Sequence, residues 1–140
     1  MSDDAAVYRV LQVSSVVYDL DDPSPVLYLH EAEAPFRGVS IPVALADAQA
    51  IQAALANRKG RRPGTHELFA AVLAGARIDV VAARIESVDG GVFRASLDLM
   101  TPEGRLVVDA RTSDAVTLAL RQAVVAPILC REEVLAALSS

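Results

Sequence analysis

Tryptophan is absent from this chain, and other aromatic residues are scarce. Its 140 residues include three tyrosines and three phenylalanines, although 53% of the residues are hydrophobic. The hydrophobic residues are therefore mostly Ala, Val, Leu and Ile, so we expect an aliphatic core. A chain of this length can bury such a core, which predicts one domain over residues 1–140.

The sequence also lacks the marks of a secreted or membrane protein. Cys130 is the only cysteine; it excludes an internal disulfide, cannot build a zinc site alone and favours a cytoplasmic location. Residues 1–4 are acidic, whereas a secretory signal peptide begins with basic residues. No apolar run approaches the ~20 residues that a membrane-spanning helix needs. We therefore expect no membrane partner.

Positive charge is in short supply, and much of it lies in one segment. The net charge is -5, which argues against a general affinity for nucleic acid. Residues 57–66, however, contain four Lys or Arg and no Asp or Glu, so the rest of the chain holds nine basic and 18 acidic residues. Such a loop can bind one anionic group, but the acidic body is a poor platform for following a long duplex.

Periodicity and turn residues predict an α+β fold with an antiparallel sheet packed against helices. Phe93, Ala95 and Leu97 alternate with polar residues, which is typical of a half-buried strand. Asp89-Gly90 is a hairpin turn signal between two such segments. The expected elements are strands at residues 7–18, 26–32, 37–43, 77–88, 91–100 and 105–109, and helices at 47–56, 67–74, from Ser113 or Asp114 to 122, and 131–138.

The same order of elements is predicted twice. Residues 7–74 and 77–138 each contain three expected strands and two expected helices, a β3α2 unit. Asp47 in the first half corresponds to Asp114 in the second, and an alanine follows each of them. We therefore expect an internal duplication in which these two aspartates occupy equivalent positions.

One segment places anion-binding groups directly before an expected helix. Arg61 and Arg62 supply positive charge, and Pro63-Gly64 makes a turn. Thr65 is a candidate N-cap, and the backbone amides that follow it can face an anion. We therefore expect a phosphate near Arg61, Arg62 and Thr65.

His66 and Glu67 follow in the first turn of that helix. A histidine there can act as a general base beside a bound phosphate, while a glutamate can hold a divalent ion or orient a water. The alternative is structural: Glu67 complements the helix dipole and His66 is an exposed first-turn residue.

A second group of polar residues lies at a strand end and the following helix start. Asp109 and Arg111 are two residues apart, so we expect them to share a face. Asp109 and Asp114 are candidate ligands of Mg²⁺ or Mn²⁺, which prefer oxygen, and Arg111 is a candidate phosphate ligand. The alternative is a helix cap with an Arg–Asp pair that joins strand to helix. Because Asp47 corresponds to Asp114, a capping role would explain the aspartate in both predicted repeats, whereas a catalytic role would explain only one.

Other polar residues predict no further site. Glu31 and Glu33 are two apart on one expected strand, which is typical of a solvated edge. Ser40 and Ser113 have no accompanying His–Asp pattern, so a serine hydrolase is unsupported.

The segments at residues 62–68 and 109–121 together resemble the bifunctional nuclease domain family, long a domain of unknown function. Weaker matches at residues 41–51 and 126–135 extend the resemblance over about residues 7–138. It implies cleavage of DNA and RNA phosphodiester bonds with Mg²⁺ or Mn²⁺ and no organic cofactor. The implied catalytic residues are His66, Glu67, Asp109 and Asp114, the implied metal ligands are Asp109 and Asp114, and the implied phosphate ligands are Arg61, Arg62, Thr65 and Arg111.

The alternative function is a non-catalytic, oligomeric domain that binds a small anion or a protein. Residues 44–46 are Ala-Leu-Ala, where the family usually has Trp and Gly, and the body of the chain is acidic. Helices rich in Ala, Val and Leu also leave apolar surface that a monomer of this size does not cover. We therefore expect a homo-oligomer under either function.

Overall fold

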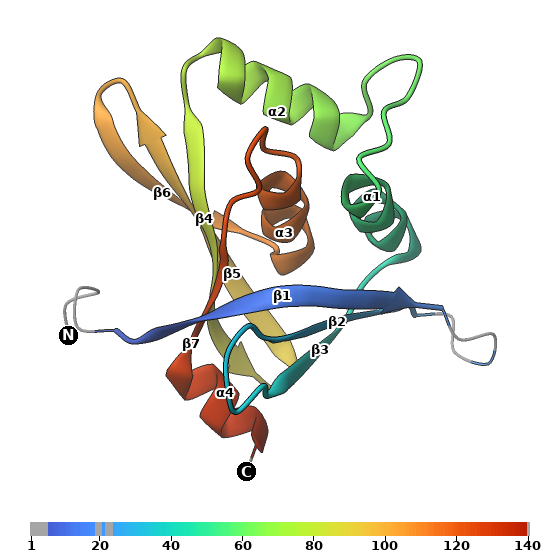
Figure 1. Cartoon of the computed structure of the whole chain (residues 1–140), viewed down its shortest axis with the longest axis vertical. Coiled ribbons are helices and arrows are strands. Elements are labelled where there is room, and N and C mark those ends of the chain that lie inside the picture. The colour runs from blue at the N-terminus through green and yellow to red at the C-terminus, as the bar shows by residue number, and fades with distance from the viewer. Residues whose placement is uncertain (1–5, 19–20, 22–23, 140) are drawn as a thin grey trace.

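A computed structural model of the protein describes residues 6–18, 21 and 24–139. Over these residues, seven strands form one sheet in the order β3-β2-β1-β7-β4-β5-β6 (Figure 1). The strands are β1 (Tyr8–Val17), β2 (Val26–Glu31), β3 (Gly38–Pro42), β4 (Asp79–Asp89), β5 (Val92–Thr101), β6 (Gly104–Ala110) and β7 (Ile128–Arg131). The helices are α1 (Leu45–Leu55), α2 (Thr65–Gly75), α3 (Thr112–Leu120) and α4 (Glu132–Ser139).

The helices cover the sheet in two groups. α3 packs on β4 and β5 and is flanked by α1 and α2, whereas α4 lies at the opposite end of the molecule against β4 and β7 (Figure 1). The predicted α+β class is therefore confirmed. The sheet is mixed, however, because β7 runs parallel to β4, while the other neighbouring strands of the described chain are antiparallel.

β7 also changes the predicted duplication. The first half follows the order of three strands and two helices, but in the second half β7 separates α3 from α4. The expected exact repeat of element order is therefore wrong. The position of the two aspartates does correspond, since Asp47 and Asp114 are each the third residue of their helix.

The turn and core predictions are confirmed in detail. Gly90 and Gly91 form a two-residue link between β4 and β5 with positive φ values of 56° and 79°, which glycine adopts without steric cost. The buried core is aliphatic and combines residues from both halves of the chain, among them Leu27, Ile51 and Ile85. Among the described helices, none is long and apolar enough to cross a membrane.

Glu31 lies inside the protein, which overturns its expected place on a solvated edge. Its side chain is 0% exposed, and its carboxylate accepts hydrogen bonds from Arg37 Nε at 2.6 Å and Arg9 Nε at 2.7 Å. The Arg37 backbone amide donates a further bond at 2.9 Å. The bonds from Arg37 outweigh the effect of burial and lower the pKa of Glu31 to about 2. Arg37 also pairs with Glu132 at 2.7 Å, so the network joins β2 to α4.

Candidate functional site

The first turns of three helices meet around one hollow. Asp47 lies in the first turn of α1, His66 in that of α2 and Asp114 in that of α3. These residues line a hollow of about 880 Å³, together with Arg111 and Thr65. Its other walls are largely apolar and include Phe69, Leu97 and Val108. We call it the three-helix hollow.

Arg111 joins two of the three helices. Its Nε donates to Asp114 Oδ2 at 2.9 Å, and its two terminal nitrogens donate to the Asp47 carboxylate at 3.1 Å each. A fourth bond reaches Asp114 Oδ1 at 3.2 Å, and these hydrogen bonds raise the pKa of Arg111. An arginine has five N–H donors, so one remains for another acceptor. The arginine thereby bridges two carboxylates, offsets one of their two negative charges and joins α1 to α3.

His66 and Asp114 form a second contact in the hollow. His66 Nε2 lies 2.9 Å from Asp114 Oδ1, and the two side chains are 19% and 34% exposed. Burial acts to raise the pKa of Asp114, but the hydrogen bonds from Arg111 and His66 outweigh it and the pKa is lowered. An ionised carboxylate only accepts hydrogen bonds, so Nε2 of His66 donates to it and Nδ1 is the ring nitrogen that can accept a proton.

Asp109 lines the hollow but does not join this network. It is the cross-strand partner of Ser96, and cross-strand partners share a face of the sheet. The next pair along the two strands, Leu97 and Val108, also lines the hollow. Asp109 and Arg111 both line the hollow, but only Arg111, which follows the strand as the N-cap of α3, bonds to α1; no hydrogen bond or ion pair joins Asp109 to another described side chain.

The residues around the hollow do not fit a divalent metal in this arrangement. The Arg111 guanidinium already binds all four oxygens of Asp47 and Asp114. No group of three or more His, Cys, Asp or Glu is placed to hold a metal within the described part of the chain. Because both oxygens of Asp114 are already bonded to Arg111, we assign no step to a metal; Asp109 and Asp114 as ligands, and the metal requirement itself, stay predictions.

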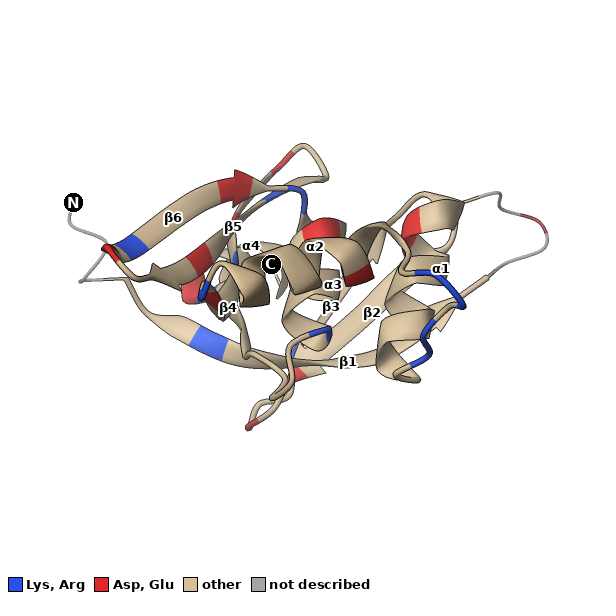
Figure 2. Ribbon diagram, turned by 90° about the horizontal axis from the view of Figure 1, so that it is seen from above, with Lys and Arg blue, Asp and Glu red and all other residues tan. Residues whose placement is uncertain are grey.

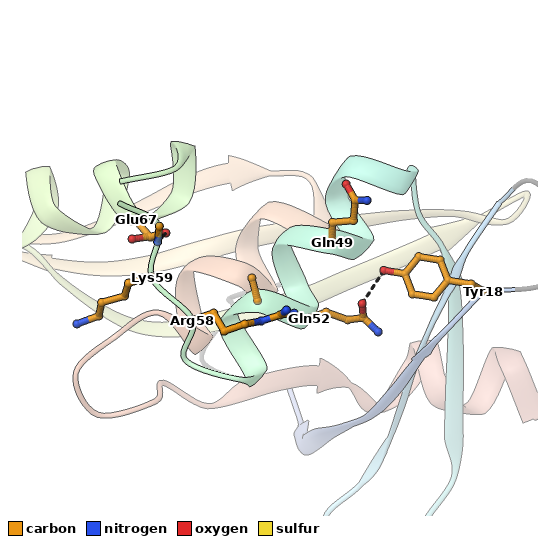
Figure 3. Close-up of a pocket in the computed structure, with 8 residues that line it drawn as sticks. Tyr18, Gln49, Gln52, Arg58, Lys59 and Glu67 are labelled. Atoms are coloured by element: carbon orange, nitrogen blue, oxygen red, sulfur yellow. Dashed lines mark hydrogen bonds between the residues drawn. The ribbon is translucent and has the colours of Figure 1, made fainter. Parts of the chain in front are cut away.

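Glu67 faces a different hollow from His66. Its Oε1 accepts a hydrogen bond from the Gly60 amide at 3.3 Å and lies 3.9 Å from a terminal nitrogen of Arg121. Figure 3 shows this second hollow, of about 590 Å³, with Glu67 beside Lys59 and the Tyr18–Gln52 hydrogen bond on its far side. Glu67 therefore holds the loop between α1 and α2, and the structure does not bring it together with the other candidate catalytic residues.

The loop between α1 and α2 presents its cations to solvent. Arg61 and Arg62 are exposed, and neither side chain forms a hydrogen bond or ion pair with another described residue. Figure 2 shows the basic stretch of this loop beside α1. The loop turns tightly at Gly60, where a Cβ atom would lie 2.7 Å from the Arg62 carbonyl oxygen. It leads into α2, so its charge adjoins the His66 turn.

The helix caps differ from the prediction. Gly64, and not Thr65, is the N-cap of α2, and Arg111 precedes α3 where Ser113 or Asp114 was expected to cap it. Neither N-cap makes a side-chain hydrogen bond. The physical reason at α3 is that the Asp114 carboxylate is already bonded to Arg111 and His66. Thr65 is the first residue of α2 and lines the three-helix hollow.

Replacing Arg61 and Arg62 together with alanine is expected to weaken phosphate and nucleic-acid binding. Both side chains are exposed, so stability should change by about 0.5 kcal/mol or less. Binding of a labelled oligonucleotide, measured over a series of salt concentrations, should show a shallower salt dependence for the double variant. Binding equal to that of the parent would leave the loop as a solvated turn.

Sequence reasoning assigned no site role to Asp47, which the structure places opposite Asp114 across Arg111. The correspondence between Asp47 and Asp114 could have indicated a role for Asp47 in the site, but it was interpreted only as evidence that both residues cap helices.

Comparison with known proteins gives one family. A family model described as the bifunctional nuclease domain matches residues 27–140, which include all the residues that line the three-helix hollow. No curated protein sequence matches the chain.

Proposed function

The chain belongs to the bifunctional nuclease domain family, and from this we propose that the three-helix hollow binds a phosphate of DNA or RNA and cleaves its phosphodiester bond. The observation that carries the proposal is the contact between His66 and Asp114 inside that hollow. A histidine held by an ionised carboxylate is a general base, and phosphodiester hydrolysis needs one to activate water.

Two features favour an anion at this place. The N-terminal ends of α1, α2 and α3 each carry a partial positive charge, and all three first turns contribute to the hollow. Asp47 and Asp114 outweigh that partial charge, but Arg111 adds a full positive charge, binds both carboxylates and keeps one N–H group for a phosphate oxygen. The exposed cations of the preceding loop add positive potential beside α2.

The proposed step uses residues of this chain alone. Nδ1 of His66 takes a proton from a water molecule as the water oxygen bonds to phosphorus. The bond between phosphorus and the leaving oxygen breaks, and that oxygen takes a proton from solvent. Asp114 stabilises the positive imidazole ring that results, and Arg111 holds Asp114 in place.

The test is a cleavage assay on end-labelled single-stranded and double-stranded DNA and RNA, in EDTA and in Mg²⁺ or Mn²⁺. We expect the wild-type chain to cleave at least one substrate. Cleavage that persists in EDTA would support the His66 step as written. Cleavage lost in EDTA and restored by Mn²⁺ would support the metal implied by the family and would require Arg111 to release a carboxylate. No cleavage in any condition would reject a nuclease.

A binding domain without catalysis is the second candidate. The observation that favours it is the use of four Arg111 N–H groups within the protein, which is typical of a structural ion-pair network. It predicts that a labelled oligonucleotide or inorganic phosphate binds without products, and that binding does not depend on the imidazole of His66. The assay above separates the two candidates.

A further inference from the structure

β6 is an edge of the sheet and carries an unusual amount of exposed apolar surface. It is the last strand in the sheet order, and in the described residues it pairs with β5 only. Its three central residues, Leu106, Val107 and Val108, are 48%, 49% and 40% exposed. An edge strand of this kind offers unpaired N–H and C=O groups to another strand.

The opposite edge of the sheet lacks these properties. β3 has five residues, and its inward positions Val39 and Ile41 are buried while Ser40 between them is exposed and polar. Pro42 ends the strand and cannot donate a backbone hydrogen bond. Short length and proline are known protections against edge pairing, and β6 has neither.

The sequence of β6 is complementary to itself in the antiparallel direction. If two copies pair with Val107 opposite Val107, Leu106 lies opposite Val108 and Arg105 lies opposite Asp109. Side chains opposite each other share a face, so each of the two Arg–Asp pairs lies on one face with the central valines. The same register therefore matches both charge and apolar character.

The residues that would form these pairs are accessible on the surface of a single copy. Arg105 binds Asp98 at 2.8 Å, yet 46% of its side chain stays exposed. Asp109 is exposed at the other end of the strand. On the helix face, Val108 and Phe69 line the same hollow, so the apolar surface of β6 continues onto α2.

We propose that two copies of this chain associate by antiparallel pairing of their β6 strands about a two-fold axis at Val107. The two sheets then become one continuous sheet, and the two exposed edges are removed. The partner subunit's Leu106 lies beside Val108 and extends the wall of the three-helix hollow. This inference does not depend on nuclease activity.

A charge at position 107 tests the axis directly. Val107→Lys or Val107→Glu places two like charges opposite each other, so each variant alone is expected to raise the dimer Kd at least about tenfold. An equimolar mixture of the two should recover the dimer, because the opposed charges are then opposite in sign. Sedimentation equilibrium gives the masses, and circular dichroism and melting confirm that each variant is folded. Ser40→Lys on β3 is the matched control and should leave the dimer unchanged.

A cysteine at the same position tests the register. Val107→Cys should form an interchain disulfide under mild oxidation, whereas Ser40→Cys should not. The native Cys130 is fully buried, and burial raises its pKa to about 12, so it does not compete. A monomeric wild-type chain would overturn the proposal. So would a dimer that neither charged variant weakens, since that dimer would use another surface.

Discussion

Replacing His66 with glutamine is expected to lower the rate of phosphodiester cleavage by about 10²- to 10⁴-fold, the usual loss for a general base. Glutamine can still bond to Asp114, but it cannot take a proton from water. His66 is only 19% exposed, and its contact with Asp114 at 2.9 Å is the one that orients the ring. The loss should therefore fall on kcat, with substrate binding largely retained. Initial rates under saturating substrate would measure it.

The chain supplies its own control for this change. It contains two histidines, and the second, His30, contacts Ser14 on the other half of the sheet. His30→Gln should cleave at the parental rate. Asp114→Asn tests the orientation of His66 separately, because an amide can donate to Nε2 and stabilise the opposite tautomer. Undiminished cleavage by His66→Gln would remove His66 from the mechanism and leave the family membership intact.

Glu31→Gln is expected to lower the free energy of unfolding by about 3 kcal/mol, which is the lower end of the loss found when one partner of a buried ion pair is removed. The carboxylate accepts bonds from Arg9 and Arg37, and an amide cannot accept all of them or neutralise the arginines. Urea unfolding at neutral pH would measure the change in free energy. Glu33→Gln, two residues along, is the matched control and should change it by about 0.5 kcal/mol or less.

The same carboxylate gives a dependence of stability on pH. The pKa of Glu31 is lowered from 4.5 to about 2 by folding, so the unfolded chain binds its proton at a higher pH than the native chain. Its contribution is complete above pH 4.5 and is lost as the pH falls towards 2. The Glu31→Gln variant should lose less stability than the parent over that interval. Parallel curves for the two proteins would contradict the assignment.

Local features of the fold could be predicted from the sequence because they depend on residues that are close together in the chain. Two-residue periodicity located β5, and the glycines between β4 and β5 located the hairpin. β7 was missed because it is four residues long and follows Pro127, and no periodicity is visible over such a length. Glu31 was misplaced because its burial depends on Arg9 and Arg37, which reach it from outside its own strand.

The candidate site was predicted only in part, because local sequence signals select residues but do not show their long-range contacts. His66 and Asp114 were selected from their positions at helix starts and Arg111 from its position at a strand end, and the structure brings them together. Asp109 was selected with Asp114 as a pair of carboxylates; both line the hollow, but only Asp114 is bonded to Arg111 and His66. The sequence could not show that Arg111 turns to Asp47, since that contact spans 64 positions.

The sheet cannot be completed until β7, the last strand in the sequence, has been synthesised. The strand lies between β1 and β4, and across the described residues it is the only strand that joins the first three strands to β4, β5 and β6. Translation supplies it after all six of the others. Until β7 is available, the first three strands and β4, β5 and β6 can pair only as two separate three-stranded sheets, each with an open edge that β7 later closes. Those two edges are the surfaces on which a chaperone, or a neighbouring nascent chain, would compete with the protein's own last strand.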